Sequence, residues 1–480
     1  MLGSSSDTTG TTRRVFRRRF VEITGTVGLT ASLAGCFGGG TRGDEPLQLT
    51  ATNEWQNNSA AIQQALYDAG LSDAIELEFI SGGSDTDEMQ NQYSQWLTAN
   101  QAKPDLLVFD SGWTLPFIAR EQIMNLEGEL ADDTLETVRN DYFEQSVNST
   151  TDRESNLYGV PLYPDFPTIQ YRADLVQAAG YDWDRYRTDP MSWEQFSHEL
   201  ADVYEQSDAA YGYNWQAASE IQLACCVFNE FVSSWGGAYF GNPEENLYGP
   251  IGDRPVTIDE EPVIDAVRMA RTFVHGTDAP DTMDAFAGGI TADEAFQWGL
   301  APSMQPFTNG DAVALRNWPY SININGDDDA LGEDMGVMPL PYGVPEGDSE
   351  YPGTGGSIGA LGGWNYCVNP ETNQLAACLE FLETLTSPEF QRANFELVGH
   401  IPPNPDVLEN ADDVPVMGRY LDTLSFVGEH TLARPATAIW GQQSDPVAQE
   451  VNAALMGDVG VEEAMTELAS RLTELEEAFS

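Results

Sequence analysis

Positive charge is scarce in this sequence of 480 residues. Lysine and arginine together number 21 against 77 aspartates and glutamates, for a formal net charge of −56, and Lys103 is the only lysine. A surface this acidic repels nucleic-acid phosphates and anionic lipid head groups, so we exclude nucleic acid as a partner. A P-loop ATP site is also excluded, because that motif requires a lysine between glycine and serine or threonine, and Lys103 lies in "AKPD".

Motifs for metal binding and nucleophilic catalysis are missing as well. The 4 histidines are scattered and form no H-E-x-x-H motif. "GGSIG" at 355–359 matches the nucleophile elbow, but a loop precedes it where the elbow requires a strand. The acidic turn at 323–334 lacks the glycine that a calcium loop carries at its sixth position. We therefore expect no cofactor and no catalytic metal. An exposed acidic turn is the expectation for 323–334, and a cation bound there is the alternative.

The N-terminus resembles an export signal. A mildly apolar run follows the arginines, and it is too short and too rich in glycine and threonine to span a membrane. "RRRFV" at 17–21 fits the twin-arginine pattern, and "LAGC" at 33–36 resembles a lipobox. We predict a signal peptide over 1–35, a lipid on Cys36, a flexible linker over 36–45, and an extracellular body held at the outer face of the cytoplasmic membrane.

The sequence leaves the state of the other cysteines open. Outside the membrane, disulfides are permitted, four cysteines allow three pairings, and buried free thiols are an equal alternative. No C-x-x-C pair suggests zinc, and two N-x-[ST] sequons are candidate glycosylation sites. The residues concerned are Cys225, Cys226, Cys367 and Cys378 for the thiols, and Asn57 and Asn148 for the glycans.

The apolar content predicts packed α/β lobes. Hydrophobic residues make up 41% of the chain and aromatic residues 10%, which argues against disorder despite the charge. Strand-like and helix-like runs alternate at the start, which indicates a parallel sheet with crossover helices, and helices dominate after residue 160. We predict two α/β lobes with a cleft at the carboxyl ends of strands. The predicted strands are "LQLTATNEW", "IELEFI", "KPDLLVFD", "MGVMPLP" and "NYCVNP", and the predicted helices include "AAIQQALYDAG", "SWEQFSHELADVYEQ", "IQLACCVFNEFVSSWGG", "TADEAFQWGL" and "VEEAMTELASRLTELEEAF".

Aromatic side chains recur beside polar residues at predicted strand ends and in loops. Aromatic rings stack on the apolar faces of sugar rings, and carboxylates or guanidinium groups pair with neighbouring hydroxyls. Each aromatic taken alone is explained as well by ordinary packing. The candidates are Trp55, Asp110, Trp113, Tyr163, Asp165, Trp215, Gln216, Trp318, Gly362, Gly363, Trp364 and Arg434.

Several segments follow one another in an order typical of one family. "KPDLLVFDSGWTLPFIAREQIMNLEGEL" is similar to the family's P-D-V-f-x-x-D-x-x-W segment, and "YGVPLYPDFPTIQYRADL" to its Y-G-x-P-x-Y-x-D segment. Further similar segments are "NWQAASEIQLACCVFNEFVSSWGG", "NGDAVALRNWPY", "LGGW" and "ARPATAIWGQQSDPVAQEV". From residue 46 onward the chain thus resembles the solute-binding proteins of carbohydrate ABC importers, closest to the trehalose/maltose-binding branch, and its acidity points to a halophilic archaeon.

The resemblance implies a two-lobed fold of the periplasmic-binding-protein class, type II. Each lobe would be a mixed sheet flanked by helices, with a ligand cleft between the lobes. Three hinge crossings are expected near 158–164, 360–366 and 425–432. The implied lobe 1 comprises 46–159 and 364–427, and the implied lobe 2 comprises 160–363 and 428–480.

The resemblance also assigns roles to single residues. In the family, the residues matching Asp110, Tyr163 and Asp165 bind ligand hydroxyls and ring faces. The other implied cleft residues are Trp318, Gly362, Gly363 and Arg434, with Trp55, Trp113, Trp364 and Trp440 as neighbours.

This chain departs from the family at two positions. Met89 or Gln90 stands where relatives carry an arginine, and the early ligand-binding glutamate has no clear match around 53–58. The hydrogen bonds of the first lobe would therefore differ, which leaves the identity of the sugar open.

The implied function is capture of a sugar by lobe closure and delivery to a membrane permease with a separate ATPase. The protein would act as a monomer and would not be an enzyme. Three alternatives remain: a glycoside hydrolase using Asp110 and Asp165, a surface lipoprotein that binds no small molecule, and a binding protein for a non-sugar solute. A hydrolase would require two carboxylates on either side of the scissile bond.

An acidic coat is typical of proteins from salt-saturated cells, where screening suppresses self-repulsion. We therefore predict that the protein is folded in multimolar salt and unfolds when the salt is removed. Circular dichroism across a salt series measures this transition. Full stability in dilute buffer would contradict a halophilic origin.

Overall fold

The computed structural model describes residues 45–479 except 84, 85, 153, 436 and 438. The predicted signal peptide and the lipid attachment at Cys36 lie outside the described residues. Within the described part of the chain, no helix has both the length and the hydropathy that a membrane crossing requires.

The first lobe is built on a mixed sheet whose early strands are parallel. Leu47–Ala51 (β1) lies between Leu77–Ser81 (β2) and Leu106–Asp110 (β3), and both pairings are parallel. This confirms the predicted alternation of strands and crossover helices. All five residues of β3 are buried, as expected for a central strand. Because β3 ends at Asp110, that carboxylate lies at the carboxyl edge of the sheet, where clefts form.

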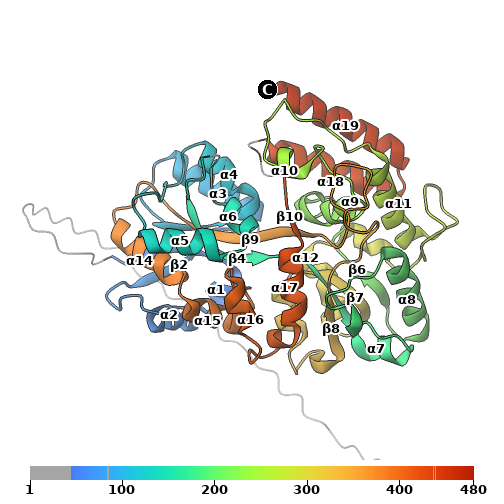
Figure 1. Ribbon diagram of the computed structural model, residues 1–480, viewed down its shortest axis with the longest axis horizontal. Helices are drawn as coiled ribbons and strands as arrows, with labels where there is room; N and C mark the ends of the chain where they lie inside the picture. The colour runs from blue at the N-terminus through green and yellow to red at the C-terminus, as the bar shows by residue number, and fades with distance from the viewer. Residues whose placement is uncertain (1–44, 84–85, 153, 436, 438, 480) are drawn as a thin grey trace, which may run out of the picture. The chain divides into compact units, whose positions relative to one another are not determined.

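Three strands carry the chain between the lobes. Gly159–Asp165 (β4) is antiparallel to Gly359–Val368 (β9), and Thr431–Ala433 (β10) runs parallel to the start of β9. The far half of β9 pairs with β3, so the sheet order is β10-β9-β3-β1-β2 with β4 also paired to β9. These strands lie at the predicted crossings, and Figure 1 shows them running between the two lobes.

The second lobe contains a separate mixed sheet of order β6-β7-β5-β8. Only two residues separate its first strand, β5, from the end of β4. β5 is antiparallel to β7 and β8, whereas β6 is parallel to β7. Both lobes therefore have the predicted mixed sheets. The bounds are Thr168–Arg172 (β5), Tyr211–Asn214 (β6), Ala312–Asn317 (β7) and Met335–Met338 (β8).

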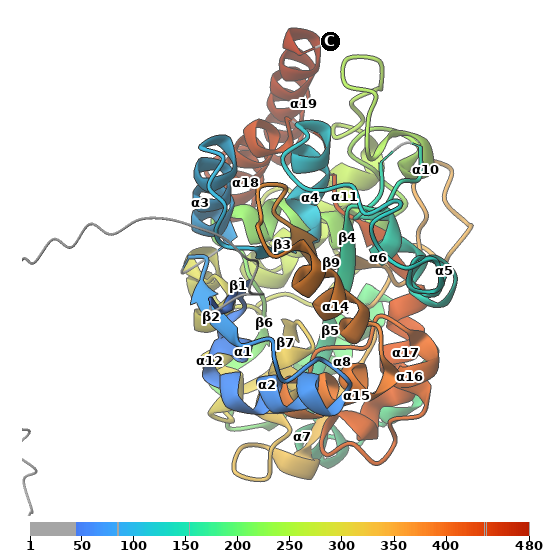
Figure 2. The same ribbon diagram turned by 90° about the vertical axis from the view of Figure 1, so that its left-hand side faces the viewer.

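Helices bury their apolar faces against the first sheet. Leu66, Phe117 and Phe381, from three different helices, belong to one core with the strand residues of this lobe. Figure 2 looks onto this lobe, with α2, α14 and α15 in front. Its helices are Asn53–Asn57 (α1), Ser59–Asp68 (α2), Thr86–Thr98 (α3), Ser111–Ala119 (α4), Asp132–Asp141 (α5), Glu144–Asn148 (α6), Leu375–Leu385 (α14) and Pro388–Val398 (α15).

The second lobe has a larger, helix-rich core. The predicted helix "SWEQFSHELADVYEQ" is confirmed, and the hydroxyl of Ser192 caps it by accepting from the amide of Gln195 at 3.2 Å. The predicted helix "IQLACCVFNEFVSSWGG" is observed as a π-helical segment, Leu223–Val227, followed by α9. The helices are Ala173–Ala178 (α7), Trp193–Gln206 (α8), Phe228–Ser234 (α9), Pro243–Asn246 (α10), Glu261–His275 (α11), Leu300–Thr308 (α12), Tyr320–Asn325 (α13), Trp440–Met456 (α18) and Val461–Ala478 (α19).

One predicted helix is wrong. "TADEAFQWGL" forms only a short 3-10 turn over Asp293–Gln297, and Trp298 after it is extended. Trp298 is buried in the second core, so tertiary packing overrides the helical pattern at this position.

The predicted end of lobe 1 at residue 427 differs from the observed packing. Pro405–Glu409 (α16) and Leu421–Glu429 (α17) contribute to a core that includes strands β7 and β8 of the second sheet. The hydroxyl of Tyr420 donates to the carbonyl of Met335 at 2.8 Å, at the start of β8. The chain therefore returns to the second sheet before α17 and not after it.

A buried ion pair fixes the C-terminal helix. The guanidinium of Arg254 donates to Glu476 on α19 from Nε at 3.1 Å and from Nη2 at 2.7 Å. Gly252 and Gln443 also donate to this carboxylate, each at 2.7 Å. The guanidinium carbon of Arg254 lies 3.6 Å from the centroid of the Phe240 ring. Since both charges are buried, removal of either partner leaves the other uncompensated.

We predict that Glu476→Gln lowers the free energy of unfolding by about 3–5 kcal/mol, because Arg254 then loses its counter-charge in the interior. Chemical denaturation followed by tryptophan fluorescence measures this. The control is Asp184→Asn, which breaks an exposed pair with Arg187 and should cost less than about 1 kcal/mol. Equal effects of the two substitutions would contradict the assigned role of Arg254.

Candidate functional site

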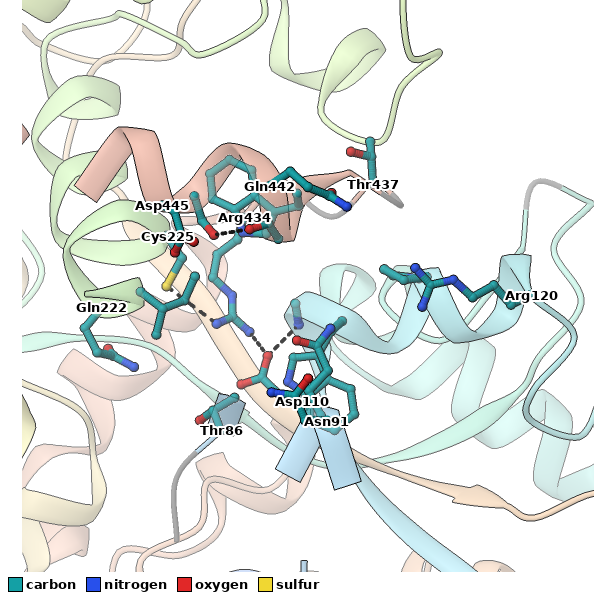
Figure 3. A pocket seen from close by; sticks show the side chains of 18 residues that line it. Thr86, Asn91, Asp110, Arg120, Gln222, Cys225, Arg434, Thr437, Gln442 and Asp445 are labelled. Carbon is teal, nitrogen blue, oxygen red and sulfur yellow. Dashed lines mark hydrogen bonds and ion pairs between the residues drawn. The ribbon is translucent and has the colours of Figure 1, made fainter. Parts of the chain in front are cut away.

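A cleft of about 460 Å³ opens between the two lobes. Its volume lies within the range of small-molecule binding pockets, about 300–1,000 Å³. Figure 3 shows α4 and the end of β3 on one side, and the π-helical segment and the start of α18 on the other. The lining residues that matter below are Gln90, Asp110, Trp113, Pro116, Arg120, Gln222, Cys225, Arg434, Thr437 and Trp440.

An ion pair between Asp110 and Arg434 lies at the base of this cleft (Figure 3). Asp110 caps α4 by accepting from the amide of Gly112 at 2.7 Å. Arg434 follows β10 and also donates from Nη2 to the hydroxyl of Ser111 at 2.9 Å. Asp110 and Arg434 are thus held together although 324 positions separate them along the chain.

Four buried polar atoms of this cleft have no partner among the described residues. They are Trp113 Nε1, Gln222 Oε1, Arg434 Nε and Thr437 Oγ1. Buried polar groups are almost always paired, so each exception requires an explanation. Two of the atoms are donors, one is an acceptor and one is a hydroxyl, which is the complement of a ligand rich in hydroxyl groups.

A second group of predicted residues meets at the ladder between β4 and β9. Asp165 lies opposite Gly362 in this ladder. A Cβ on Gly362 would be 3.2 Å from the ring of Trp318 and 3.4 Å from Cβ of Asp165. Gly363 has a φ of +121°, which favours glycine, and a Cβ there would lie 2.5 Å from the carbonyl oxygen of Tyr163. Small residues therefore let Trp318, Asp165 and the backbone approach closely.

The negative charge of the Asp165 carboxylate is poorly compensated by its surroundings. Burial raises the pKa of its carboxyl well above the ordinary value, and the nearby Glu54 raises it further. Arg316 and Arg434 act in the opposite direction without cancelling these effects. Arg316 is engaged elsewhere, since it donates to the buried Glu230 from Nε at 2.9 Å. The neighbouring protein groups thus do not fully compensate the negative charge of the Asp165 carboxylate.

The imidazole of His400 packs against one face of the Tyr163 ring. The two rings stack with centroids 3.7 Å apart and an angle of 16°. Burial lowers the pKa of His400 to about 3, and its Nε2 lies 3.9 Å from the carboxylate of Glu54. A neutral imidazole therefore supports the face of Tyr163.

The sequence around 53–58 showed no clear match for the family's early ligand-binding glutamate. In the structure, however, Glu54 lies close to Tyr163 and Asp165. It contributes to the pKa shifts of both Tyr163 and Asp165, and its side chain is half-buried. Its position was the available signal, since Glu54 comes three residues after the buried strand β1, at the edge where clefts form.

The remaining predicted tryptophans fall into different environments. Trp440 lines the cleft, and Trp364 lies opposite both Asp110 and Tyr163 in the sheet. Trp55 is fully buried, and its indole N–H donates to Asn394 at 2.8 Å. The structure thus places Trp55 in the first core, with no free face toward the cleft.

Met89 and Gln90, one of which stands where relatives carry an arginine, lie in different environments. Met89 is buried in the first core, and Gln90 lines the cleft. Arg120, which directly follows α4, lines the same cleft and brings a guanidinium to this side of it. Polar contacts from lobe 1 are therefore available without the arginine that relatives carry.

The cysteines divide into two pairs with different states. Cys225 and Cys226 form a disulfide between neighbours in the π-helical segment, and Cys225 faces Arg434 in the cleft. Cys367 and Cys378 are buried free thiols. No group of three or more histidine, cysteine, aspartate or glutamate side chains in the described part of the chain could hold a metal ion.

Comparisons with known proteins place the chain in a family and support its fold. The sequence profile of the family described as bacterial extracellular solute-binding protein matches residues 67–415, well over half of the chain. Maltose-bound T. maritima MalE3 is 22% identical with a TM-score of 0.72, over 90% of this chain and 99% of that one.

Two further structures have the same fold at lower identity. The GacH receptor of Streptomyces glaucescens, solved unliganded and with acarbose, is 18% identical with a TM-score of 0.68, over 90% of this chain and 98% of that one. The cyclic α-maltosyl-1,6-maltose binding protein of Arthrobacter globiformis is 17% identical with a TM-score of 0.65, over 90% and 100%.

At these identities the solved structures establish the fold, which is the two-lobed fold of periplasmic binding proteins. The family match includes the first two crossing strands, β4 and β9, and strands of both sheets. The chain belongs to the family of bacterial extracellular solute-binding proteins.

Proposed function

We propose that this protein captures a neutral sugar between its lobes and delivers it to a membrane permease of an ABC importer. The observation that carries the proposal is the meeting of Trp318, Asp165 and the bare backbone of Gly362 at the interlobe ladder. An aromatic face beside a carboxylate suits a ring with apolar C–H faces and equatorial hydroxyls. The unpartnered donors and acceptors in the cleft at Asp110 and Arg434 supply further hydrogen bonds that such a ligand needs.

The substrate class is an α-linked disaccharide such as maltose or trehalose, or a related sugar. Solved structures of similar fold include a maltose-bound protein, a receptor in complex with acarbose and a cyclic α-maltosyl-1,6-maltose binding protein. Binding rather than hydrolysis is favoured because Asp110 is already engaged by Arg434 and by the amide of Gly112. A carboxylate held in that way is a hydrogen-bond partner and not a free acid or base.

The proposal includes the location of the protein. A twin-arginine signal over 1–35 and a lipid on Cys36 would tether the body to the outer face of the membrane, next to the permease. The body would act as a monomer in concentrated salt, and lobe closure would be driven by the difference in sugar affinity between the open and closed forms.

We predict that Asp165→Ala weakens sugar binding by about ten- to a hundredfold, because ligand hydroxyls lose their acceptor, worth about 1–3 kcal/mol. Calorimetric titration with maltose and trehalose in multimolar salt measures this. The control is Asp413→Ala, an exposed aspartate that pairs with the surface residue Arg392. Wild-type affinity in Asp165→Ala would contradict the role of Asp165 in sugar binding. Monosaccharide products in the calorimeter sample would indicate a hydrolase.

The pKa of Asp165 generates a pH prediction for the ligand-free protein. Because the folded state holds this proton to a higher pH than the unfolded state, ionisation above the unfolded value of about 3.8 costs stability. The stability of Asp165→Asn minus that of the wild type should therefore increase as the pH rises from 4 towards 7. A difference that does not change with pH would contradict the burial of an uncompensated carboxyl.

The contribution of His400 to stability should depend on pH in the opposite direction to that of Asp165. Its pKa falls from 6.5 to about 3 on folding, so the unfolded state gains the proton first when the pH drops below 6.5. The wild type should lose about 1.4 kcal/mol per pH unit below 6.5 relative to His400→Gln. Thermal unfolding of both variants and the wild type at pH 4, 5, 6 and 7 measures the two trends together.

A further inference from the structure

The wall that the second lobe contributes to the cleft contains a disulfide between two neighbouring residues. Cys225 and Cys226 are bonded within the π-helical segment Leu223–Val227, and Cys225 lines the cleft (Figure 3). Cys226 belongs to the core of the second lobe and does not line the cleft. Segments of π-helix are rare and occur frequently at functional sites. The disulfide therefore connects the core of the second lobe to the surface that faces the ligand.

Cys225 contacts the guanidinium of Arg434, which also reaches the first lobe. Arg434 donates from Nη1 to Sγ of Cys225 at 3.7 Å, and from Nη2 to the hydroxyl of Ser111 at 2.9 Å and to the carboxylate of Asp110. The sulfur is a weak acceptor, so it acts on Arg434 mainly through its position. Nε of Arg434 is buried and has no partner among the described residues. Contacts from both lobes thus determine where this unpaired donor lies.

Close packing around the disulfide determines what its reduction would change. The side chains of Cys225 and Cys226 are only 1% and 0% exposed. Two sulfur atoms that are no longer bonded must move apart to van der Waals distance, and a close-packed core accommodates such a change only by displacement. Cys226 is enclosed by the core, whereas Cys225 borders the cleft. The displacement therefore falls on Cys225 and is directed towards Arg434.

We propose that the Cys225–Cys226 disulfide positions Arg434 for the sugar, and that reduction of this disulfide weakens sugar binding. The inference rests on the proposed function and adds a redox dependence to it. The displaced sulfur of Cys225 shifts the guanidinium, so the pair with Asp110 and the free Nε donor lose the geometry that the ligand requires.

The reductant is a small dithiol that reaches Cys225 through the cleft. The S–S bond of the protein breaks, and its two sulfur atoms gain two electrons and the two protons of the dithiol. The two sulfur atoms of the dithiol are oxidised and form a new disulfide. The products are two cysteine thiols and one small-molecule disulfide, and oxidation of the thiols restores the original state.

Sugar binding and the redox state of the disulfide should be coupled in both directions. We expect the oxidised protein to bind sugar about tenfold more tightly than the reduced protein, the value of one hydrogen bond to a charged group. By reciprocity, saturating sugar then favours the oxidised form by the same factor. For a two-electron couple, a factor of ten corresponds to about 30 mV. Bound sugar should therefore lower the reduction potential by about 30 mV, a shift that a purely structural disulfide would not show.

The test compares the full-length protein before and after treatment with dithiothreitol. Calorimetric titration with maltose and trehalose in multimolar salt measures the affinity in each state, and reoxidation should restore the higher value. Alkylation under denaturing conditions, followed by peptide mapping, reports the redox state of Cys225 and Cys226. Equilibration with reduced and oxidised dithiothreitol at a series of ratios, with and without saturating sugar, measures the shift in potential.

Two variants distinguish this disulfide from the other cysteines. The double variant Cys225→Ser/Cys226→Ser should bind sugar as weakly as the reduced wild type and should not respond to dithiothreitol. The matched control, Cys378→Ala, removes a buried free thiol that does not line the cleft, and it should respond to dithiothreitol as the wild type does. The comparison of oxidised and reduced wild type does not depend on the folding of either variant.

Equal sugar affinity of the oxidised and reduced wild type overturns the inference and leaves the proposed function standing. Free thiols at Cys225 and Cys226 before treatment, a disulfide that dithiothreitol does not reduce in the native protein, or a reduction potential that sugar does not change has the same consequence. Absence of maltose and trehalose binding by the oxidised protein overturns the inference together with the proposed function.

Discussion

The antiparallel ladder between β4 and β9 is the constraint on which the rest of the structure depends. β9 pairs with β4 on one side and with β3 on the other, so Asp110, Trp364 and Tyr163 lie in one line across three strands. The next positions of the ladder bring Asp165 opposite Gly362 as the chain leaves the first lobe. A change at this ladder would alter both the connection between the lobes and the placement of the candidate ligand-binding groups.

Three of the arginines of this acidic chain pair with carboxylates that are themselves buried. Arg254 and Arg316 each neutralise one interior glutamate, and Arg434 neutralises Asp110 in the cleft. Asp165 has no such partner of its own, although Arg316 lies in its neighbourhood with its guanidinium carbon 4.5 Å from the centroid of the Trp318 ring. Uncompensated burial of this kind lowers the stability of a free protein and is typical of binding sites.

Local patterns in the sequence were sufficient for most elements, and long-range packing explains the exceptions. The alternating strands and the capped helix at Ser192 are encoded within single segments. Trp298 lies in a core instead of in the helix that its local pattern predicts. α17 contacts the second sheet through Thr423, whose hydroxyl donates to the carbonyl of Val337, 86 positions away. Glu54 was missed although its place just after β1 was a local signal, because its proximity to Tyr163 and Asp165 arises only from the packing of distant segments.

The sequence by itself determined the acidic character, the two-lobed class and the strand ends that carry Asp110 and Asp165, because composition, periodicity and segment order are properties of the chain. Tertiary structure alone decided which of the candidates meet. It separated the buried Trp55 from the cleft, joined Asp110 to Arg434 across the lobes, and brought the Cys225–Cys226 disulfide next to Arg434. Those outcomes depend on how distant segments pack, and packing is decided by the whole set of contacts and not by any one stretch of residues.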